Sequence, residues 1–393
     1  MNESVATKAA VTSPLDSIHQ RLGATMIERD GWSLPQSYGD VLLEYATVRE
    51  GAAGLIDLSS RGRIMVSGTE AVQFLNGLIT NDMKTLAEHS WMPAAFPNVQ
   101  GRLIASVRVI RLHDNGTDGN VCPVFLIDTE AATHGSVLKN IERFTLAGDF
   151  RVTDVTNQTA MLSVQGKKAV EMVRAVVGDD AAEIAANGVE QIEWPRNAEG
   201  ASDVTEGVMV MRAAHTAEDG FDFVVPSNDA GSLFEELENA GARPVGHDAL
   251  EMLRIEAGVP LYGVDMDETN VVTEAALDDA VSYTKGCYVG QEIIARIKYR
   301  GHVAKKLSGL MFEQAVPLEV GSAIQSSDGK EIGRITSKTY SPHLGRTIAL
   351  AYLKYDYLAA GTQVKVVSAA NEWRAQVTEL PFVNGSWRKK KDD

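Results

Sequence analysis

The chain has 393 residues, of which 44% are hydrophobic and 23% are charged, a composition typical of a globular protein with two or three domains. Its 37 basic and 53 acidic residues give a net charge of -16, which argues against general nucleic-acid binding. No apolar run approaches the roughly 20 residues that a membrane helix requires. The two cysteines, Cys122 and Cys287, lack the spacing of a metal site or a disulfide framework and favour a reducing, cytoplasmic setting.

The spacing V-x-G-x-x-A-V occurs twice in the first half of the chain, at residues 66–72 and 164–170. Each copy predicts a strand, a sharp turn at glycine and a helix whose alanine lies close to the sheet. After the first copy, apolar residues recur at helical spacing. The two copies therefore suggest two related α+β layers.

The remaining elements follow in chain order. Alternating residues predict a strand over 102–112, whereas the acidic stretch 187–207 lacks apolar periodicity and is expected to be a surface excursion. Helices are predicted over 229–240 and over 247–257. From Leu307 onward, short alternating runs separated by glycine, serine and proline predict a small β barrel or sandwich.

The most informative local pattern is the octapeptide K-G-C-Y-V-G-Q-E at 285–292. Its two glycines bracket Cys287, and a helix is predicted to begin near Gln291. The positive end of that helix and Lys285 would favour the thiolate of Cys287. The same residues also fit a small buried cysteine in a glycine-rich turn. Cys122 precedes an apolar run and is expected to be structural.

The octapeptide resembles the signature of the YgfZ-like proteins, folate-binding relatives of the glycine-cleavage T-protein that assist iron–sulfur enzymes. The resemblance extends over nearly the whole chain, through segments at 22–26, 31–32, 38–40, 54–63, 75–82, 164–166, 216–222, 254–265 and 337–342. It implies an α+β fold in which three domains, two of them related and ferredoxin-like and the third a C-terminal β barrel, form a ring around a folate-sized hole. The implied division is a polar tail (1–13), a split folate-binding domain (14–54 and 152–285), an inserted α+β domain (55–151), the signature loop with a linker helix (286–305), the barrel (306–387) and a charged tail (388–393).

The resemblance also implies that the protein binds tetrahydrofolate or a derivative, including polyglutamylated forms. An acidic residue in segment 216–222, with Glu218 and Asp222 as the candidates, would hold the pterin together with Arg254. A carboxylate can accept parallel N–H bonds and an arginine can donate a fork of them. Glu218 equally suits a solvated turn before a glycine. The predicted folate ligands are Glu218, Asp222, Arg254, Tyr262, Asn98 and Gln100.

For chemistry, the resemblance assigns the functional thiol to Cys287, beside Lys285. The rest of the motif consists of Gly286, Tyr288, Gly290, Gln291 and Glu292. In the T-protein, the segment resembling 98–106 ends in acidic residues, one of which is needed for transfer of the one-carbon group. Here these positions are Ala105 and Ser106, so glycine-cleavage aminomethyltransferase activity is not expected.

Two distant cysteines cannot hold a stable iron–sulfur cluster, and no stable metal site is predicted. The expected function is that of a folate-binding accessory protein for assembly or repair of iron–sulfur clusters, acting indirectly on tRNA modification. Its expected partners are reduced folate and iron–sulfur proteins or assembly factors, with no direct nucleic acid and no membrane. Two alternatives stay open: a folate-dependent methyl or aminomethyl transferase with another base, and a non-catalytic folate-binding scaffold.

A basic stretch follows the octapeptide in this otherwise acidic chain. Such a stretch is commonly a solvated face, or it could be a dock for a polyglutamate tail or an acidic partner. Its role stays open. The stretch contains Arg296, Lys298, Arg300, His302, Lys305 and Lys306.

Overall fold

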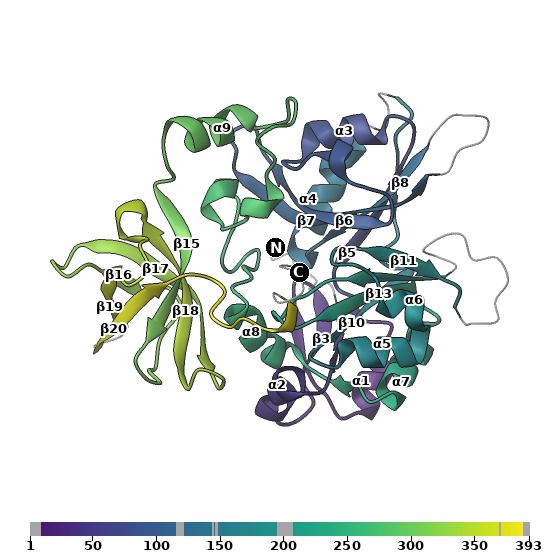
Figure 1. Ribbon diagram of the computed structural model, residues 1–393, viewed down its shortest axis with the longest axis horizontal. Helices are drawn as coiled ribbons and strands as arrows, with labels where there is room; N and C mark the ends of the chain where they lie inside the picture. Colours follow the sequence, from purple (N-terminus) through teal and green to yellow (C-terminus); the bar gives the residue numbers. More distant parts are fainter. Residues whose placement is uncertain are drawn as a thin grey trace, which may run out of the picture.

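The computed structural model describes residues 9–114, 122–143, 145, 148–194, 207–368 and 371–387. Figure 1 shows two sheets with their helices and a separate β barrel. Residues of all three parts line a central cavity. This arrangement confirms the predicted α+β fold with a C-terminal barrel. Within the described ranges, no helix is long and apolar enough to cross a membrane.

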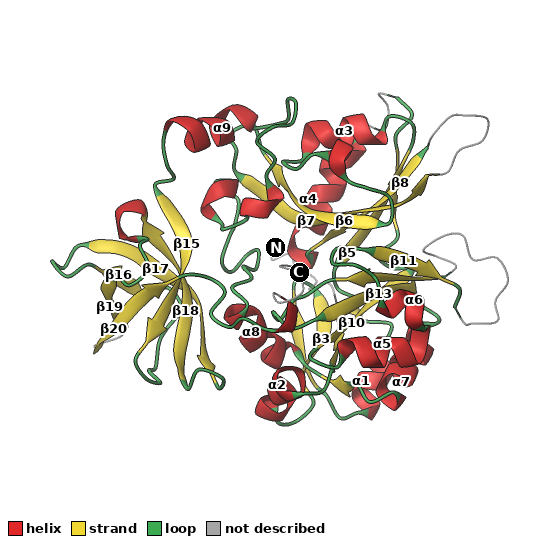
Figure 2. Cartoon of the chain, in the orientation of Figure 1, coloured by secondary structure: helices red, strands yellow, loops and turns green. Residues whose placement is uncertain are grey.

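The first large sheet has six strands in the order β11-β12-β13-β10-β4-β14. Helices α5, α6 and α7 lie on its outer side (Figure 2), and the apolar faces of α5 and α7 share a core with β10 and β13. The strands are β4 (Gly54–Asp57), β10 (Thr159–Gln165), β11 (Val189–Ile192), β12 (Val208–Arg212), β13 (Gly220–Pro226) and β14 (Arg243–Pro244); the helices are α5 (Ala169–Val177), α6 (Asp179–Ala182) and α7 (Ala230–Asn239).

The second large sheet has five strands in the order β6-β7-β8-β5-β9. Helices α3 and α4 pack on one face of this sheet. Its strands are β5 (Gly62–Ser67), β6 (Ser90–Pro97), β7 (Leu103–Asp114), β8 (Pro123–Thr129) and β9 (Arg151–Asp154); its helices are α3 (Ala71–Leu78) and α4 (Ala131–Glu142).

The barrel is closed in the order β15-β18-β17-β16-β19-β20. A linker helix, α9 (Gln291–Arg300), precedes it. The barrel strands are β15 (Lys305–Phe312), β16 (Ala323–Gln325), β17 (Glu331–Ser341), β18 (Arg346–Lys354), β19 (Gln363–Ser368) and β20 (Asn371–Thr378). The other elements are β1 (Val11–Thr12), β2 (Thr25–Arg29) and β3 (Trp32–Ser37) in a three-stranded sheet, helices α1 (Asp16–Arg21), α2 (Val41–Glu50) and α8 (His247–Glu256), and the short 3₁₀ helices η1 (Met83–Thr85), η2 (Val272–Glu274), η3 (Asp278–Ala280) and η4 (Tyr355–Tyr357).

The two large sheets pack against each other through the faces that their outer helices leave free. Along β7, Val107 and Val109 point to the helix side, whereas Ile110 and Leu112 join a core with residues of β10, β12 and α8. Successive strand residues alternate between the two faces of a sheet. Even-numbered residues of β7 and β8 therefore face the other sheet, and this alternation decides which side chains reach the cavity.

Both copies of the V-x-G-x-x-A-V spacing form the predicted strand–turn–helix unit. The turn glycines have positive φ, 127° at Gly68 and 140° at Gly166. A Cβ at Gly68 would lie 2.1 Å from the carbonyl oxygen of Asp149, and one at Gly166 would lie 2.6 Å from that of Ala52. Both positions therefore require glycine. The prediction of two related layers agrees with these units.

One expectation about secondary structure was wrong in part. The stretch 187–207 contains strand β11, which pairs with β12 at the edge of the six-stranded sheet. Only Val189 of this strand is buried, because an edge strand covers little of the core. The sequence of β11 therefore shows no alternation of apolar and polar residues. The remainder of the predicted excursion, 195–206, and the tails at 1–8 and 388–393 lie outside the described residues. The predicted domain limits stay a prediction.

After the barrel, the chain returns to the first sheet and its helices. The backbone N–H groups of Phe382 and Val383 donate to the carbonyl oxygen of Glu256, at 2.9 and 3.1 Å. The backbone N–H and the hydroxyl of Ser386 donate to Oε2 of Glu218, at 2.9 and 2.7 Å. This return fixes the barrel to the sheets at a second point.

A buried cation joins the two carboxylates of this region. The guanidinium of Arg49 donates to Glu218 at 2.8 Å and to Glu256 at 2.7 Å, and all three side chains are almost fully buried. Burial alone would raise the pKa of Glu218, but the hydrogen bonds from Ser386 and from Arg49 outweigh burial and lower it. Arg49 is thus the buried cation between two buried carboxylates.

We expect Arg49→Met to lower the free energy of unfolding by ~3–5 kcal/mol at pH 7, because two buried carboxylates lose their cation. The lowered pKa of Glu218 adds stability to the wild type above the ordinary glutamate pKa, and this contribution is lost as the pH falls. The difference between the two proteins should therefore shrink towards pH 4. Urea unfolding at several pH values measures it. Arg21→Met, which breaks the exposed Arg21–Glu235 pair, is the control and should cost about 1 kcal/mol or less.

Candidate functional site

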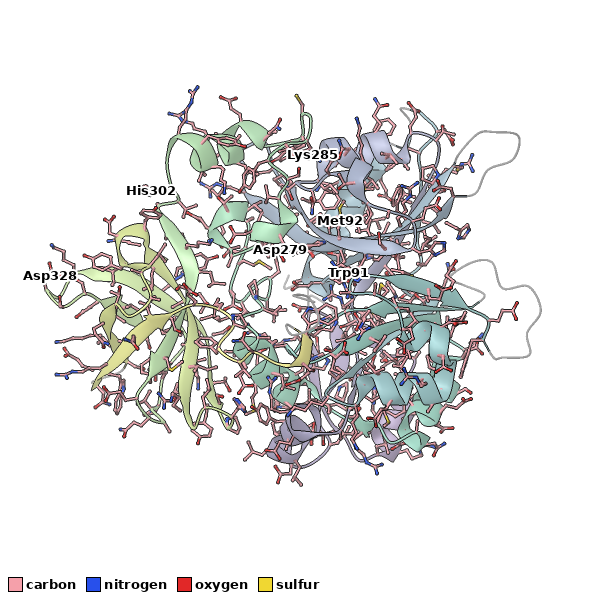
Figure 3. All side chains as sticks on the ribbon, in the orientation of Figure 1. Trp91, Met92, Asp279, Lys285, His302 and Asp328 are labelled. Carbon is pink, nitrogen blue, oxygen red and sulfur yellow. The ribbon has the colours of Figure 1, made fainter. Side chains whose placement is uncertain are left out.

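A central cavity of about 1040 Å³ lies between the two sheets, the loops after α8 and the barrel. Trp91, Met92 and Asp279, labelled in Figure 3, lie on its wall, with Trp91 and Met92 on β6 and Asp279 in η3. Other lining residues come from β7, β15 and the segment after β20. The three parts of the molecule therefore build one shared cavity.

A chain of ion pairs runs along the cavity between the facing sheets. Arg61 binds Asp128 with two bonds of 2.7 and 2.8 Å. Arg108 donates to Asp128 and to Asp222, each at 2.6 Å, and so links the two sheets. At the far end, Nε2 of His215 lies 2.9 Å from Asp222. Arg61, Arg108 and His215 line the cavity, whereas the two aspartates lie behind them.

The environment keeps both aspartates ionised. Burial opposes ionisation of Asp222, but His215 and Arg108 outweigh burial and hold its pKa well below the usual range. Arg108 and Arg61 do the same for the pKa of Asp128. Within this series of ion pairs, Nη2 of Arg108 is buried and has no hydrogen-bond partner among the described residues. An unpaired buried donor is costly, so it suits a ligand that accepts a hydrogen bond there.

A smaller cavity of about 150 Å³ lies beside the central one. The two cavities share Arg61, Glu130 and His215 in their walls. Nε2 of His247, in the wall of the smaller cavity, is buried without a partner, and burial lowers the pKa of this histidine. A ligand in the central cavity could therefore extend a polar group past Glu130.

The structure separates the two acidic candidates of segment 216–222. Glu218 is buried between Arg49 and Ser386 and is not among the residues that line either cavity. Asp222 lies behind Arg108 and His215 at the central cavity. Arg254 lines the smaller cavity, but it is engaged by Glu251, by Asp265 at 2.5 Å and by Ser337 at 2.7 Å. Glu218 and Arg254 are therefore not brought together, and their roles as folate ligands stay predictions.

The other predicted ligands also lie apart. The backbone N–H of Tyr262 donates to Oε2 of Glu130 at 3.0 Å, so this residue touches the cavity wall from behind. Asn98 accepts from the backbone N–H groups of Gln100 and Arg102, at 2.9 and 3.0 Å, and thereby closes a turn. Neither Asn98 nor Gln100 lines either cavity. Their assignment as ligands also stays a prediction.

The octapeptide forms a loop that clamps neighbouring segments. Nζ of Lys285 donates to the carbonyl oxygens of Asn76, Ile79 and Asn81, at 2.7, 3.0 and 2.6 Å. Lys285 lies 5.0 Å from the ring centre of buried Tyr288. Burial lowers the pKa of Lys285 to about 8, while three carbonyl acceptors favour its charged form. The lysine therefore binds the end of α3.

The rest of the motif completes the loop. Gly290 has a φ of 76°, and a Cβ there would lie 2.4 Å from the carbonyl oxygen of Asn98, so the loop packs on the 98–101 turn. The side-chain amide of Gln291 lies 3.3 Å from the carbonyl oxygen of Gly286. Cys287 and Glu292 are exposed, and Cys122 is half-buried. Whether Cys287 is a functional thiol stays a prediction.

The basic stretch lies on α9 and the start of β15. His302 stacks on Tyr355 with ring centres 3.7 Å apart (Figure 3 labels His302), and Lys306 pairs with Asp278 at 2.7 Å. Arg296, Lys298 and Arg300 are exposed on the helix. Part of the stretch is thus bound within the protein.

Sequence reasoning missed the central members of the site: Arg61, Arg108, Asp128, Glu130 and His215. A signal was present, because Arg108 interrupts an apolar strand and Asp128 follows the apolar run 123–127. Alternate residues of a strand lie on the same face of a sheet. The residues that share one face here are Ser106, Arg108, Asp128 and Glu130. Ser106 lines the central cavity, whereas Ala105 is buried in the core on the helix side.

Comparisons with known proteins agree along the whole chain. The family model described as "GCVT N-terminal domain" matches residues 15–285, and "Glycine cleavage T-protein C-terminal barrel domain" matches 305–384. An aminomethyltransferase from Symbiobacterium thermophilum is 31% identical, covering 99% of this chain and 100% of that protein. One from Shouchella clausii is 30% identical over 94% of this chain and 97% of its own length. A crystal structure of aminomethyltransferase T from Bartonella henselae has a TM-score of 0.83 at 24% identity, covers 96% of this chain and 99% of its own, and agrees in fold.

These matches correct the expected function. An accessory role in iron–sulfur assembly with an indirect effect on tRNA modification is wrong, because the full-length relatives are named aminomethyltransferases. The same matches overturn the expectation that aminomethyltransferase activity is absent, and they give no support to iron–sulfur partners. That expectation treated Ala105 and Ser106 as decisive. The structure gives a physical reason for the error: the cavity wall still carries a carboxylate, at Glu130.

We expect Lys285→Met to lower the free energy of unfolding by roughly 2–3 kcal/mol, because three carbonyl groups lose a charged donor. Cys287→Ser, two residues away and exposed, should change it by less than about 0.5 kcal/mol. Urea unfolding of both variants measures the difference. Equal, small effects would show that the lysine does not clamp α3.

Proposed function

Since the chain belongs to the glycine-cleavage T-protein family, we propose that it is an aminomethyltransferase that transfers a one-carbon group to tetrahydrofolate. The observation that carries this proposal is the central cavity. All three parts of the chain line this cavity, and the chain matches its relatives over nearly its full length. A cavity of this size takes a ligand of several rings. The acceptor would supply the nitrogen atoms that receive the carbon.

The residues of the cavity suit such a ligand. Trp91 and Trp387 offer flat apolar surfaces on its wall. Nη2 of Arg108 offers an unused donor, and Asp128 and Asp222 fix the position of this arginine. His215, which lies 2.9 Å from Asp222, completes the polar wall. A rigid donor and aromatic walls orient a heteroaromatic ring, because the donor must meet an acceptor atom of that ring. We assign ring binding to Arg108, His215 and Trp91.

Finer assignments are part of this proposal. Membership of the YgfZ-like branch would rest on the octapeptide 285–292. Arg254 would shape the smaller cavity through its contact with Asp265, and Glu218 would act on the site only through the fixed return of the chain at Ser386. A polyglutamate tail, where present, would lie near Lys306, the residue of the basic stretch that lines the central cavity.

We expect Ala214→Trp to weaken tetrahydrofolate binding at least about tenfold, because an indole would fill space that the ligand needs. Ala214 lines the cavity and is half-buried. The test is a fluorescence or calorimetric titration with tetrahydrofolate, followed by an assay of methylene-tetrahydrofolate formation from an aminomethyl donor.

The matched control is Ala359→Trp, the same substitution at an exposed position outside the cavity. It should bind and react like the wild type. Wild-type protein that binds tetrahydrofolate but forms no product would contradict the enzymatic proposal. Equal binding by both tryptophan variants would contradict the assignment of the cavity.

A further inference from the structure

The carboxylates on the walls of the two cavities differ in their surroundings. Asp30, Asp278, Asp279 and Glu379 are exposed, and Glu251 is paired with Arg254. Glu130 is half-buried and, among the described residues, is the carboxylate that lines both cavities. It is therefore less exposed than the four exposed carboxylates and, unlike Glu251, forms no ion pair among the described residues.

The position of Glu130 follows from the strand ladder. β7 and β8 are antiparallel, with Arg108 opposite Asp128 and Val107 opposite Thr129. The next step of the same register places Glu130, directly after β8, opposite Ser106. Ser106 and Glu130 both line the central cavity. The pairing of β7 with β8 thus places the carboxylate of Glu130 next to Ser106, a wall residue that has no carboxylate itself.

One oxygen of Glu130 is free to act. Oε2 accepts the backbone N–H of Tyr262 at 3.0 Å, which fixes the side chain, whereas Oε1 accepts no hydrogen bond from the described residues. A group that transfers protons needs a free oxygen at the ligand site and a fixed orientation. Glu130 lines both cavities, and the bond to Oε2 holds its side chain.

We propose that Glu130 is the proton-transfer residue of the cavity, accepting a proton from the acceptor nitrogen and returning it to the departing amine. This inference rests on the proposed function and adds a residue with a role to it. For a donor X–CH₂–NH₂ and an acceptor with two N–H groups, the X–CH₂ and CH₂–NH₂ bonds break and two N–CH₂ bonds form. The two protons released by the acceptor nitrogens end on X and on the amine, giving X–H and NH₃. No oxidation or reduction takes place.

The surroundings of Glu130 bring the pKa of its carboxyl group into the range that suits this role. Burial raises its pKa to about 7, and the contribution of burial exceeds those of Arg61 and of the Tyr262 N–H, which lower the pKa. Asp128 raises it further and Arg254 lowers it, and His215 faces the same cavities. A proton-transfer group is most effective when its pKa lies near the working pH. Glu130 can therefore both accept and release a proton near neutrality.

The test compares wild type, Glu130→Gln and Glu142→Gln in the full-length protein. Glu142 is the exposed last residue of the helix that Glu130 precedes, so it is the matched control. We expect Glu130→Gln to reduce kcat for methylene-tetrahydrofolate formation roughly 100-fold, with tetrahydrofolate affinity unchanged within about threefold. Glu142→Gln should behave like the wild type.

A second readout does not depend on turnover. Carbon-13 NMR of glutamate carboxyl groups in the ligand-free protein should show one titration near pH 7 that is absent from Glu130→Gln. Because His215 faces the same cavity, this carbon signal separates the carboxyl from the imidazole. If Glu130→Gln is poorly folded, Glu130→Asp replaces it: the carboxylate is kept but withdrawn, so a smaller loss of kcat is expected.

The outcomes are distinguishable. Equal kcat for wild type and Glu130→Gln, or titration of Glu130 in the ordinary glutamate range, overturns the role of Glu130 and leaves the proposed function in place. Tetrahydrofolate binding without product in the wild type overturns the proposed function, and with it the reaction in which Glu130 acts.

Discussion

The architecture depends on one buried guanidinium, that of Arg108, which binds Asp128 on its own sheet and Asp222 on the facing sheet. The apolar core between the sheets attracts them without fixing their alignment, since burial of apolar surface is not directional. An ion pair between two strands is directional, and desolvation makes misalignment costly. Polar side chains at that end of the interface also prevent the sheets from closing, so the cavity begins where the apolar core ends.

The same constraint explains what could be predicted from the sequence. The local spacing of residues was sufficient to predict α3 and α5 with their turn glycines, α7 and α8, and the barrel. Each of these elements depends on residues that are close in the chain. Strand β11 was missed because an edge strand buries only Val189. The pairing of Arg108 with Asp222 was missed because the two residues are 114 residues apart, and no local pattern reveals such a contact. The partner of Glu218, Arg49, is likewise distant, 169 residues away in the chain.

The octapeptide has a structural role besides the functional thiol that is predicted for it. Its lysine satisfies three carbonyl groups near the end of α3, and Gly290 allows the loop to lie against the 98–101 turn. These contacts connect the five-stranded sheet and its helix α3 to the loop before α9. These contacts with neighbouring backbone segments involve much of the motif. The exposed Cys287 takes no part in them.

The return of the chain at Ser386 has a consequence for how the protein is made. Glu218, Arg49 and Glu256 are all synthesised before the barrel, yet among the described residues one oxygen of Glu218 receives its donors only from Ser386. Until the residues after the barrel have left the ribosome, this oxygen of Glu218 has no donor from Ser386 and bonds to water instead. The contacts that fix the end of the chain to the first sheet are accordingly among the last to form during synthesis.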